Sequence, residues 1–149
     1  MMTKSGLAVH GTCVDIKGTG VLICGKSGAG KSSLALQLID RGATLVADDQ
    51  TLLSFERGGL VAQCPVSLRG VMEVRGIGLC AFPFQQKSYL RLCIEICEKQ
   101  DLERLPDSLF VEYYEIKVPL LKLKKADPLG AIKVELKLCH KDKSNVLSS

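Results

Sequence analysis

Residues 25–32 carry the clearest chemical signal in the sequence, because Gly-Lys-Ser-Gly-Ala-Gly-Lys-Ser fits the phosphate-binding pattern G-x-x-x-x-G-K-[ST]. The glycines allow consecutive backbone N–H groups to point into one concavity, where they receive phosphate oxygens. Lys31 supplies a positive charge that reaches the outer phosphates, and the Ser32 hydroxyl is suited to ligate Mg²⁺. The expected phosphate-binding residues are therefore Gly25, Lys26, Ser27, Gly28, Ala29, Gly30, Lys31 and Ser32.

The segments on either side of this loop have the expected periodicities. Residues 20–24 form a short apolar run that predicts a buried strand. After the loop, Leu34 and Leu38 lie four residues apart, with Ala35 and Ile39 beside them, so a helix with one apolar face is predicted up to Arg41-Gly42. The order of strand, loop and helix favours a nucleotide-phosphate site over the alternative, a glycine-rich turn between two core elements.

Carboxylates follow the next predicted strand, residues 43–47, as the pair Asp48-Asp49. Phosphoryl transfer requires a phosphate cradle, a bound metal, a group that handles the acceptor's proton, and positive charge on the transition state. Adjacent carboxylates at the end of a strand diverge, so one is suited to the metal and the other to the substrate. The alternative is an Asx-type turn leading into Gln50. Glu73 is a third candidate, although a lone glutamate is more often a surface charge.

Glycines and charges are concentrated in residues 68–78, where three of each occupy eleven positions. Glycine weakens a simple strand, so a backbone that passes close to a ligand explains this segment better. The remaining pattern is mainly of the β type. We expect hairpins over residues 7–24 and 51–64, with His10 in the first strand, a half-exposed strand over residues 90–97, and a β-rich segment over 109–123 with Pro119 at an edge or bulge. A closing helix is expected from Asp127 to Cys139, with Pro128 in its first turn and with Leu129, Ile132, Leu136 and Cys139 at helical spacing.

Length and composition set limits on the class of protein. The 149 residues fit a single domain, residues 1–149, with an ordered core over about residues 7–140. A net charge of +4, 5% aromatic residues and no Trp give little support to nucleic-acid binding. The seven cysteines form no C-x-x-C pair, and no apolar run reaches membrane length. We therefore expect reduced thiols and a soluble, cytoplasmic protein that does not bind a membrane.

Four segments together resemble one family, the catalytic domain of bacterial HPr kinase/phosphorylase. They are His10-Gly11-Thr12, residues 25–32, Leu45-Val46-Ala47-Asp48-Asp49 and Glu73-Val74-Arg75-Gly76-Ile77-Gly78. The loop alone is shared with many NTPases, whereas Glu-x-Arg-Gly-x-Gly after a doubled aspartate is far more restrictive. The resemblance covers residues 7 to about 140. It implies an α/β fold of the HPr kinase and phosphoenolpyruvate-carboxykinase-like type, a P-loop kinase core with a mostly β sheet around a central phosphate-binding helix.

The resemblance also implies a reaction and roles for its residues. The protein would use ATP and Mg²⁺ to phosphorylate a serine of the carrier protein HPr, and would remove that phosphate with inorganic phosphate, releasing pyrophosphate. Asp49 would be the base that takes the serine proton, and Lys31 would bind the transferred phosphate. Ser32 and Glu73 would hold Mg²⁺ with Asp48 beside them. His10 would lie close to the reacting centre; without the resemblance it is an ordinary strand histidine.

The family has an essential arginine in an Asp-Arg-Leu/Ile-Gly context, and Glu103-Arg104-Leu105-Pro106 is the nearest match. Arg104 is therefore the expected catalytic arginine, with a surface arginine as the alternative, while Arg75 is a candidate ion-pair partner that holds Glu73. Residues 82–87 and 122–128 depart from the family's loops, and Ser33 stands where an acidic residue is common. Full-length members carry an N-terminal domain, so this sequence resembles a short form. The family forms hexamers, so a homo-oligomer is expected.

Two other functions remain open. A P-loop kinase of small molecules would have an arginine-rich lid, and the sequence shows no such segment. A nucleotide-binding regulatory module without transfer activity would keep the phosphate loop and lose Asp49, which is present. A GTPase would need an Asn-Lys-x-Asp segment to recognise guanine, and the sequence contains none.

Overall fold

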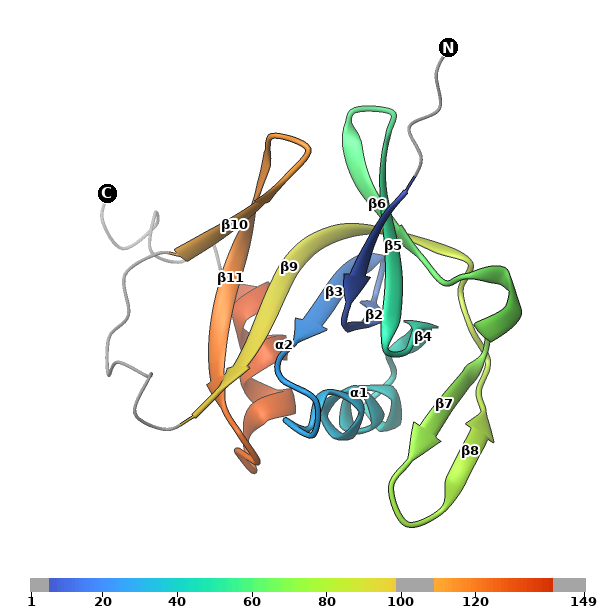
Figure 1. Cartoon of the computed structure of the whole chain (residues 1–149). Coiled ribbons are helices and arrows are strands. Elements are labelled where there is room, and N and C mark those ends of the chain that lie inside the picture. The colour runs from blue at the N-terminus through green and yellow to red at the C-terminus, as the bar shows by residue number, and fades with distance from the viewer. Residues whose placement is uncertain (1–5, 99–108, 141–149) are drawn as a thin grey trace.

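The computed structural model describes residues 6–98 and 109–140. Strands dominate, and two α-helices interrupt them (Figure 1). The elements are β1 (Leu7–His10), β2 (Thr12–Ile16), β3 (Thr19–Cys24), α1 (Lys31–Asp40), β4 (Thr44–Ala47), β5 (Gln50–Glu56), β6 (Gly59–Gln63), a 3₁₀ turn (Val66–Leu68), β7 (Val71–Val74), β8 (Gly78–Ala81), β9 (Lys87–Cys97), β10 (Leu109–Tyr113), β11 (Ile116–Lys124) and α2 (Gly130–His140).

Nine strands form one sheet in the order β1-β5-β6-β9-β3-β2-β4, with β10 and β11 joined to it through β9. The long strand β9 connects the parts of this sheet. It pairs with β6 near its start, with β11 near its end, and with β3 along its other edge. Strands β7 and β8 form a separate hairpin at one side of the molecule (Figure 1).

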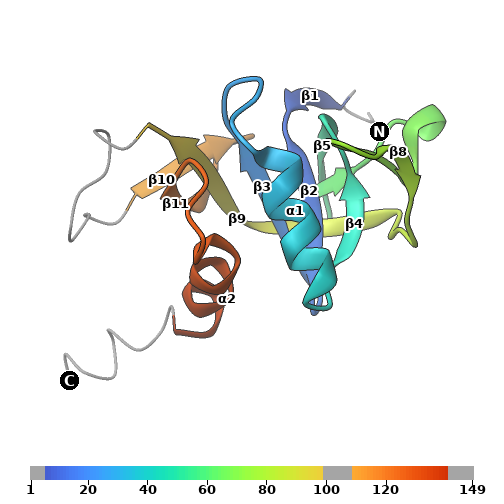
Figure 2. The ribbon, with the colours of Figure 1, turned by 90° about the horizontal axis from the view of Figure 1, so that it is seen from below.

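Both helices cover the same face of the sheet, with α1 over β2, β3 and β4 and α2 beside β11 (Figure 2). Side chains alternate between the two faces along each strand, so apolar side chains form a hydrophobic core on each face of the sheet. Val14 and Ile23 pack with Leu34, Leu38 and Val134 on the helical face. Cys13 and Leu22 point to the other face and pack against residues such as Leu53 and Ala62 of the folded-over β5–β6 hairpin. The two cores fix the strand β3 that leads into the phosphate loop.

The structure confirms the predicted helix after the loop. Leu34, Ala35 and Leu38 are buried, and Ile39 packs partly against the same core. The helix ends at Asp40, and its C-cap Arg41 is followed by Gly42 with φ 112°, the left-handed conformation typical of a residue after a helix. The structure therefore has a mostly β, α/β architecture with a helix directly behind the phosphate loop. None of the helices in the described ranges is long and apolar enough to cross a membrane.

Two details differ from the sequence pattern. The first strand, β1, pairs with β5 and not with β2, so the first hairpin consists of β2 and β3. The sequence pattern places Pro128 at the first position of the closing helix, but α2 begins two residues later, at Gly130. Its core-facing residues are Ala131 and Val134, whereas Leu129, Ile132 and Leu136, which suggested the helix, are 52%, 40% and 49% exposed. Their spacing identified a helix but not its buried face.

Candidate active site

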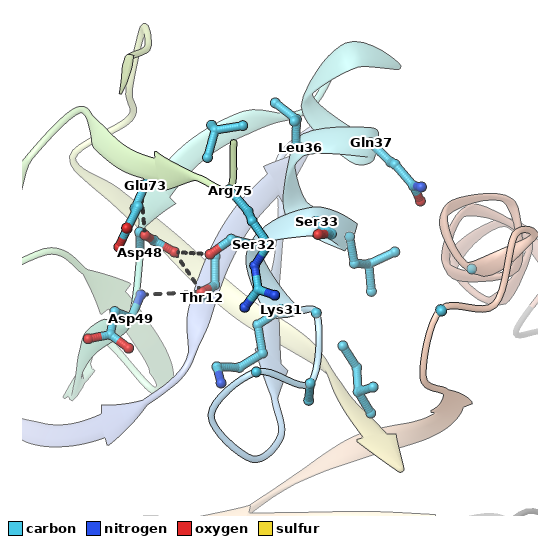
Figure 3. A pocket seen from close by; sticks show the side chains of 18 of the residues that line it. Thr12, Lys31, Ser32, Ser33, Leu36, Gln37, Asp48, Asp49, Glu73 and Arg75 are labelled. Carbon is cyan, nitrogen blue, oxygen red and sulfur yellow. Dashed lines mark hydrogen bonds between the residues drawn. The ribbon is translucent and has the colours of Figure 1, made fainter. Parts of the chain in front are cut away.

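A cavity of about 1250 Å³ opens at the end of β3 and β4, above the first turn of α1. Its walls come from four segments that are distant in sequence (Figure 3). These are the phosphate loop with the first turns of α1, the doubled aspartate after β4, the β7–β8 hairpin, and residues 123–128 at the end of β11 and beyond it; Thr12 of β2 and Ile96 of β9 also line the cavity. The structure therefore brings together most of the residues expected to carry chemistry.

The phosphate loop has the backbone conformation that an anion cradle requires. Gly28 and Gly30 have φ values of 82° and 102°, a region open to glycine at little cost, and Gly30 caps the N-terminus of α1. The first N–H groups of α1 therefore face the cavity mouth, where the helix dipole favours an anion. A further bond from the Ala29 N–H to the Lys26 carbonyl, at 2.9 Å, stabilises the turn.

Lys31 is the only buried lysine among the described residues, at 7% exposure. Its Nζ donates to the carbonyl oxygens of Gly25 and Lys26, at 3.0 and 3.1 Å. An ammonium group has three donors, so one remains for a phosphate oxygen. The burial of this charge at the base of the loop fits the expected role of binding phosphate.

Asp48 lies at the centre of a hydrogen-bond network. Its Oδ1 accepts from the hydroxyl groups of Ser32, at 2.8 Å, and Thr12, at 2.9 Å. Its Oδ2 lies 3.4 Å from the backbone nitrogen of Glu73, which donates to it. The expected association of Asp48 with Ser32 and Glu73 is therefore present, and it connects α1, β2 and β7.

Thr12 is a site residue to which the sequence analysis assigned no role, although it belongs to the segment His10-Gly11-Thr12. It is fully buried, and its hydroxyl oxygen also accepts from the Asp49 N–H at 3.2 Å. One hydroxyl thus contacts both aspartates. The available signal was its position directly after His10-Gly11, as a polar side chain that opens an otherwise mainly apolar strand.

Asp49 points away from Asp48 (Figure 3). Its φ is 68°, a left-handed conformation that is uncommon for residues other than glycine, asparagine and aspartate. Its Oδ1 lies 2.8 Å from Nε2 of His10. The turn after β4 is closed by the backbone, from the Gln50 N–H to the Asp48 carbonyl at 2.7 Å, so neither carboxylate is used for an Asx turn there. Divergent carboxylates are therefore present, as the sequence predicted.

The side chains fit a magnesium ion. Asp48, Glu73 and the Ser32 hydroxyl meet at the cavity wall, and all three line it. Mg²⁺ is typically held by one or two carboxylates together with substrate phosphates and water, so a complete protein cage is not needed. Among the described residues, no group of three or more His, Cys, Asp or Glu side chains that could hold a metal ion is found.

Two thiols lie close to this site, the half-buried Cys24 and the buried Cys64. Burial raises the pKa of Cys24, which directly precedes the loop, although the charge of Lys31 opposes the shift. Burial likewise raises the pKa of Cys64, against the effect of the Arg69 charge. Both thiols therefore remain protonated and add no negative charge beside the phosphate loop.

The structure describes Arg75 but not Arg104. Arg104 lies outside the described residues, so its role as the catalytic arginine stays a prediction. Arg75 lines the cavity, and its side chain extends from the β7–β8 turn toward the phosphate loop (Figure 3). The four ion pairs in the described part of the chain do not include one between Arg75 and Glu73. The idea that Arg75 holds Glu73 by an ion pair is therefore wrong for this structure.

Comparison with known proteins agrees with this geometry. Residues 2–127 match the family model described as HPr Serine kinase C-terminal domain. The chain is 38% identical over 133 residues to the HPr kinase/phosphorylase of Cupriavidus metallidurans, which covers 80% of this chain and 41% of that relative. It is 42% identical over 109 residues to the HPr kinase/phosphorylase of Bordetella pertussis, covering 66% of this chain and 35% of that protein.

The chain thus spans about two-fifths or less of the length of these curated relatives. Among solved structures, it is similar to the Hpr(Ser) kinase/phosphatase from Coxiella burnetii, with a TM-score of 0.79 and 29% sequence identity. That match covers 95% of this chain and 94% of the other. With a phosphate loop, divergent aspartates and a family model that matches most of its length, the chain belongs to the HPr Serine kinase C-terminal domain family.

Proposed function

We propose that this protein is an ATP-dependent protein kinase that phosphorylates a serine of an HPr-type phosphocarrier protein. The observation that carries the proposal is the separation of the two aspartates beside a phosphate loop. Asp48 is bound to Ser32 at 2.8 Å, whereas Asp49 is turned away to His10 and is exposed to an incoming acceptor. This arrangement would provide a metal ligand and a separate proton acceptor in one cavity.

In the proposed reaction, the loop N–H groups and Lys31 hold the phosphates of ATP. Asp49 accepts the proton of the acceptor serine while the serine oxygen forms a bond to the γ-phosphorus, and the bond from that phosphorus to the bridging oxygen of ADP breaks. His10 contacts Asp49 at 2.8 Å and orients its carboxylate. Ser32, Asp48 and Glu73 would hold Mg²⁺, which neutralises phosphate charge when bound.

The same groups are suited to the reverse process, in which inorganic phosphate removes the serine phosphate and pyrophosphate is released. An oxygen of inorganic phosphate then bonds to the phosphorus of phosphoserine, the bond from that phosphorus to the serine oxygen breaks, and protonated Asp49 gives its proton to the serine oxygen; the attacking dihydrogen phosphate restores that proton. We include this phosphorolysis in the proposal because the relatives are named HPr kinase/phosphorylase. The phosphorolysis activity is tested by an experiment separate from that for the kinase activity.

The experiment that tests the proposal uses the protein with ATP, Mg²⁺ and a bacterial HPr, followed by intact-mass and fragment analysis. We expect one added phosphate on a serine of HPr. An HPr variant with alanine at that serine is the matched control. ATP binding without transfer to HPr would favour the regulatory module, and phosphorylation of a small metabolite instead would favour the small-molecule kinase. For the reverse reaction, phosphoserine-HPr and inorganic phosphate are mixed and pyrophosphate is measured.

We further propose that the chain acts as a single domain in a homo-oligomer, a hexamer by family resemblance, in the cytoplasm. Exposed apolar side chains support an assembly: Val66, Ile77 and Leu79 are 74%, 79% and 77% exposed. All seven cysteines are free, which fits a reducing compartment. Light scattering coupled to size-exclusion chromatography measures the assembly, and a monomeric mass at micromolar concentration would contradict it.

A further inference from the structure

Alternation along β7 determines where the Arg75 side chain lies. Met72 is 1% exposed and packs in the core on the helical face of the sheet, and Val74 packs partly against the same core. Side chains alternate between the two faces of a strand, so Glu73 is directed away from this core and toward the cavity. Arg75, the first residue after the strand, also lines the cavity (Figure 3).

The hairpin holds Arg75 in a defined position. Glu73 pairs with Leu79 and Val74 with Gly78, and the Ile77 N–H donates to the Val74 carbonyl at 2.9 Å to close the turn. At the same time, the Glu73 N–H lies 3.4 Å from Asp48 Oδ2, which joins β7 to the aspartate network. Arg75 is therefore carried by a short hairpin whose strand is attached to the proposed metal ligands.

Arg75 has no hydrogen bond or ion pair in the described part of the chain, in contrast to Lys31. Lys31 already donates to two backbone carbonyls. Arg75 also lies in a cavity lined by four carboxylates, Asp48, Asp49, Glu73 and Asp127, yet it pairs with none of them. A guanidinium group has five donors in a planar fork that matches phosphate geometry, so a phosphoryl group in this cavity is a suitable partner.

We infer that Arg75 is a catalytic residue that binds the oxygens of the phosphoryl group during its transfer. The inference rests on the proposed function. As the bond to the ADP oxygen breaks and the bond to the serine oxygen forms, negative charge spreads over the three equatorial oxygens of the transferred group. Arg75 donates to these oxygens from the side opposite the loop. It keeps its own proton throughout, and Asp49 takes the proton of the serine.

The first test compares Arg75→Ala with Arg75→Lys and with Arg91→Ala, an exposed arginine on β9 outside this cavity. Arginines that stabilise this transition state are worth about 10³-fold or more, so we expect Arg75→Ala to lower kcat for HPr phosphorylation at least about 100-fold. The KM for ATP should change only a fewfold, because ground-state binding rests on the loop. Arg75→Lys should retain an intermediate rate, and Arg91→Ala should match the wild type. Added guanidinium ion should restore part of the rate of Arg75→Ala without raising that of the wild type.

The second test does not require HPr. Calorimetry measures the affinity for ADP with and without aluminium fluoride, which mimics the transferred phosphoryl group, in the presence of Mg²⁺. We expect aluminium fluoride to strengthen ADP binding in the wild type and in Arg91→Ala, and this gain to fall at least about tenfold in Arg75→Ala.

These outcomes separate the inference from the proposed function. A wild-type rate together with an undiminished aluminium fluoride gain in Arg75→Ala would overturn the role of Arg75. If the wild type shows the gain through Arg75 but does not phosphorylate HPr, the inference stands and the proposed acceptor is wrong. Should Arg75→Ala fail to fold, Arg75→Lys decides: equal kcat and equal gain in that variant would refute a role for the guanidinium fork.

Discussion

The substitution Asp49→Asn separates proton transfer from every other property of the site. Asp49 has φ 68°, and asparagine is among the residues that tolerate this conformation best, so the backbone need not change. The Asp49 side chain is 65% exposed and its His10 partner 53%. A pair this exposed contributes about 1 kcal/mol or less, and the asparagine keeps one oxygen acceptor. We therefore expect the free energy of unfolding to change by less than about 1 kcal/mol.

The expected effect on the reaction is much larger. Loss of a positioned acid/base costs about 10²–10⁴ in rate, which corresponds to roughly 2.7–5.4 kcal/mol of activation free energy. Binding of Mg·ATP should remain near normal, because the loop, Lys31 and Ser32 are unchanged. Asp49→Ala should lose the same activity and about 1 kcal/mol more stability, since alanine fits the left-handed region less well.

Three measurements on each variant test this reasoning: urea unfolding, calorimetric titration with Mg·ATP, and the rate of HPr phosphorylation. Glu73→Gln is the comparison, and it should instead raise the Mg²⁺ concentration needed for half-maximal rate. Equal loss of nucleotide binding in Asp49→Asn and Glu73→Gln would show that the metal and base roles are assigned wrongly. A wild-type rate in Asp49→Asn would remove Asp49 from the chemistry.

Three further predictions concern binding, packing and pH. Lys31→Ala should weaken ATP binding by about 2–3 kcal/mol through loss of a charge-assisted contact, and unchanged calorimetric affinity would exclude the loop as the site. Met72→Ala should lower the free energy of unfolding by about 2–5 kcal/mol, because this 1% exposed side chain fills the core under β7; a urea midpoint equal to that of the wild type would contradict the packing. Burial raises the pKa of Cys93 from 9.0, and that of Tyr113 from 10.0, to about 12 in each case. Because the folded state holds these protons more tightly, this contribution to stability is complete below pH 9 and is lost as pH rises from about 9 to 12. Urea midpoints that stay constant across this range would contradict it.

The sequence predicted the phosphate loop, the strand before it and the helix after it well, because each of these patterns depends only on residues close together in the sequence. The spacing of Leu34 and Leu38 indicates a helix, and the apolar run before Gly25 indicates a strand, regardless of the rest of the chain. Strand partners were less predictable. Residues 7–10 are followed at once by β2, yet β1 pairs with β5, about forty residues away, since Gly11 redirects the chain and its N–H donates to the Asp49 carbonyl at 3.0 Å.

The closing helix illustrates a different limit. Four apolar residues at helical spacing identify a helix, but α2 also contains Ala131 and Val134 on another face, and these two are buried at 5% and 0% exposure. Gly130 lies close to Leu34 and Leu123, so the first turn of α2 packs directly on the core. The small residues are therefore buried where the backbone approaches the core. Which face of the helix is buried depends on how closely its backbone approaches the core, and that distance cannot be read from a single sequence.

The assignment of the catalytic arginine depends on tertiary structure in the same way. In the sequence, Arg75 is two residues from Glu73, and an ion pair between them is the simplest local interpretation. In the structure, the Glu73 N–H lies 3.4 Å from Asp48 Oδ2, so β7 is attached to the aspartate network through its backbone. The side chain of Glu73 then faces the proposed metal position, and the turn at Gly76 carries Arg75 past it toward the loop (Figure 3). A strand fixed by its backbone leaves both of its charged side chains available to the cavity, and this is why an arginine that looks like a structural partner in the sequence is placed to bind phosphate.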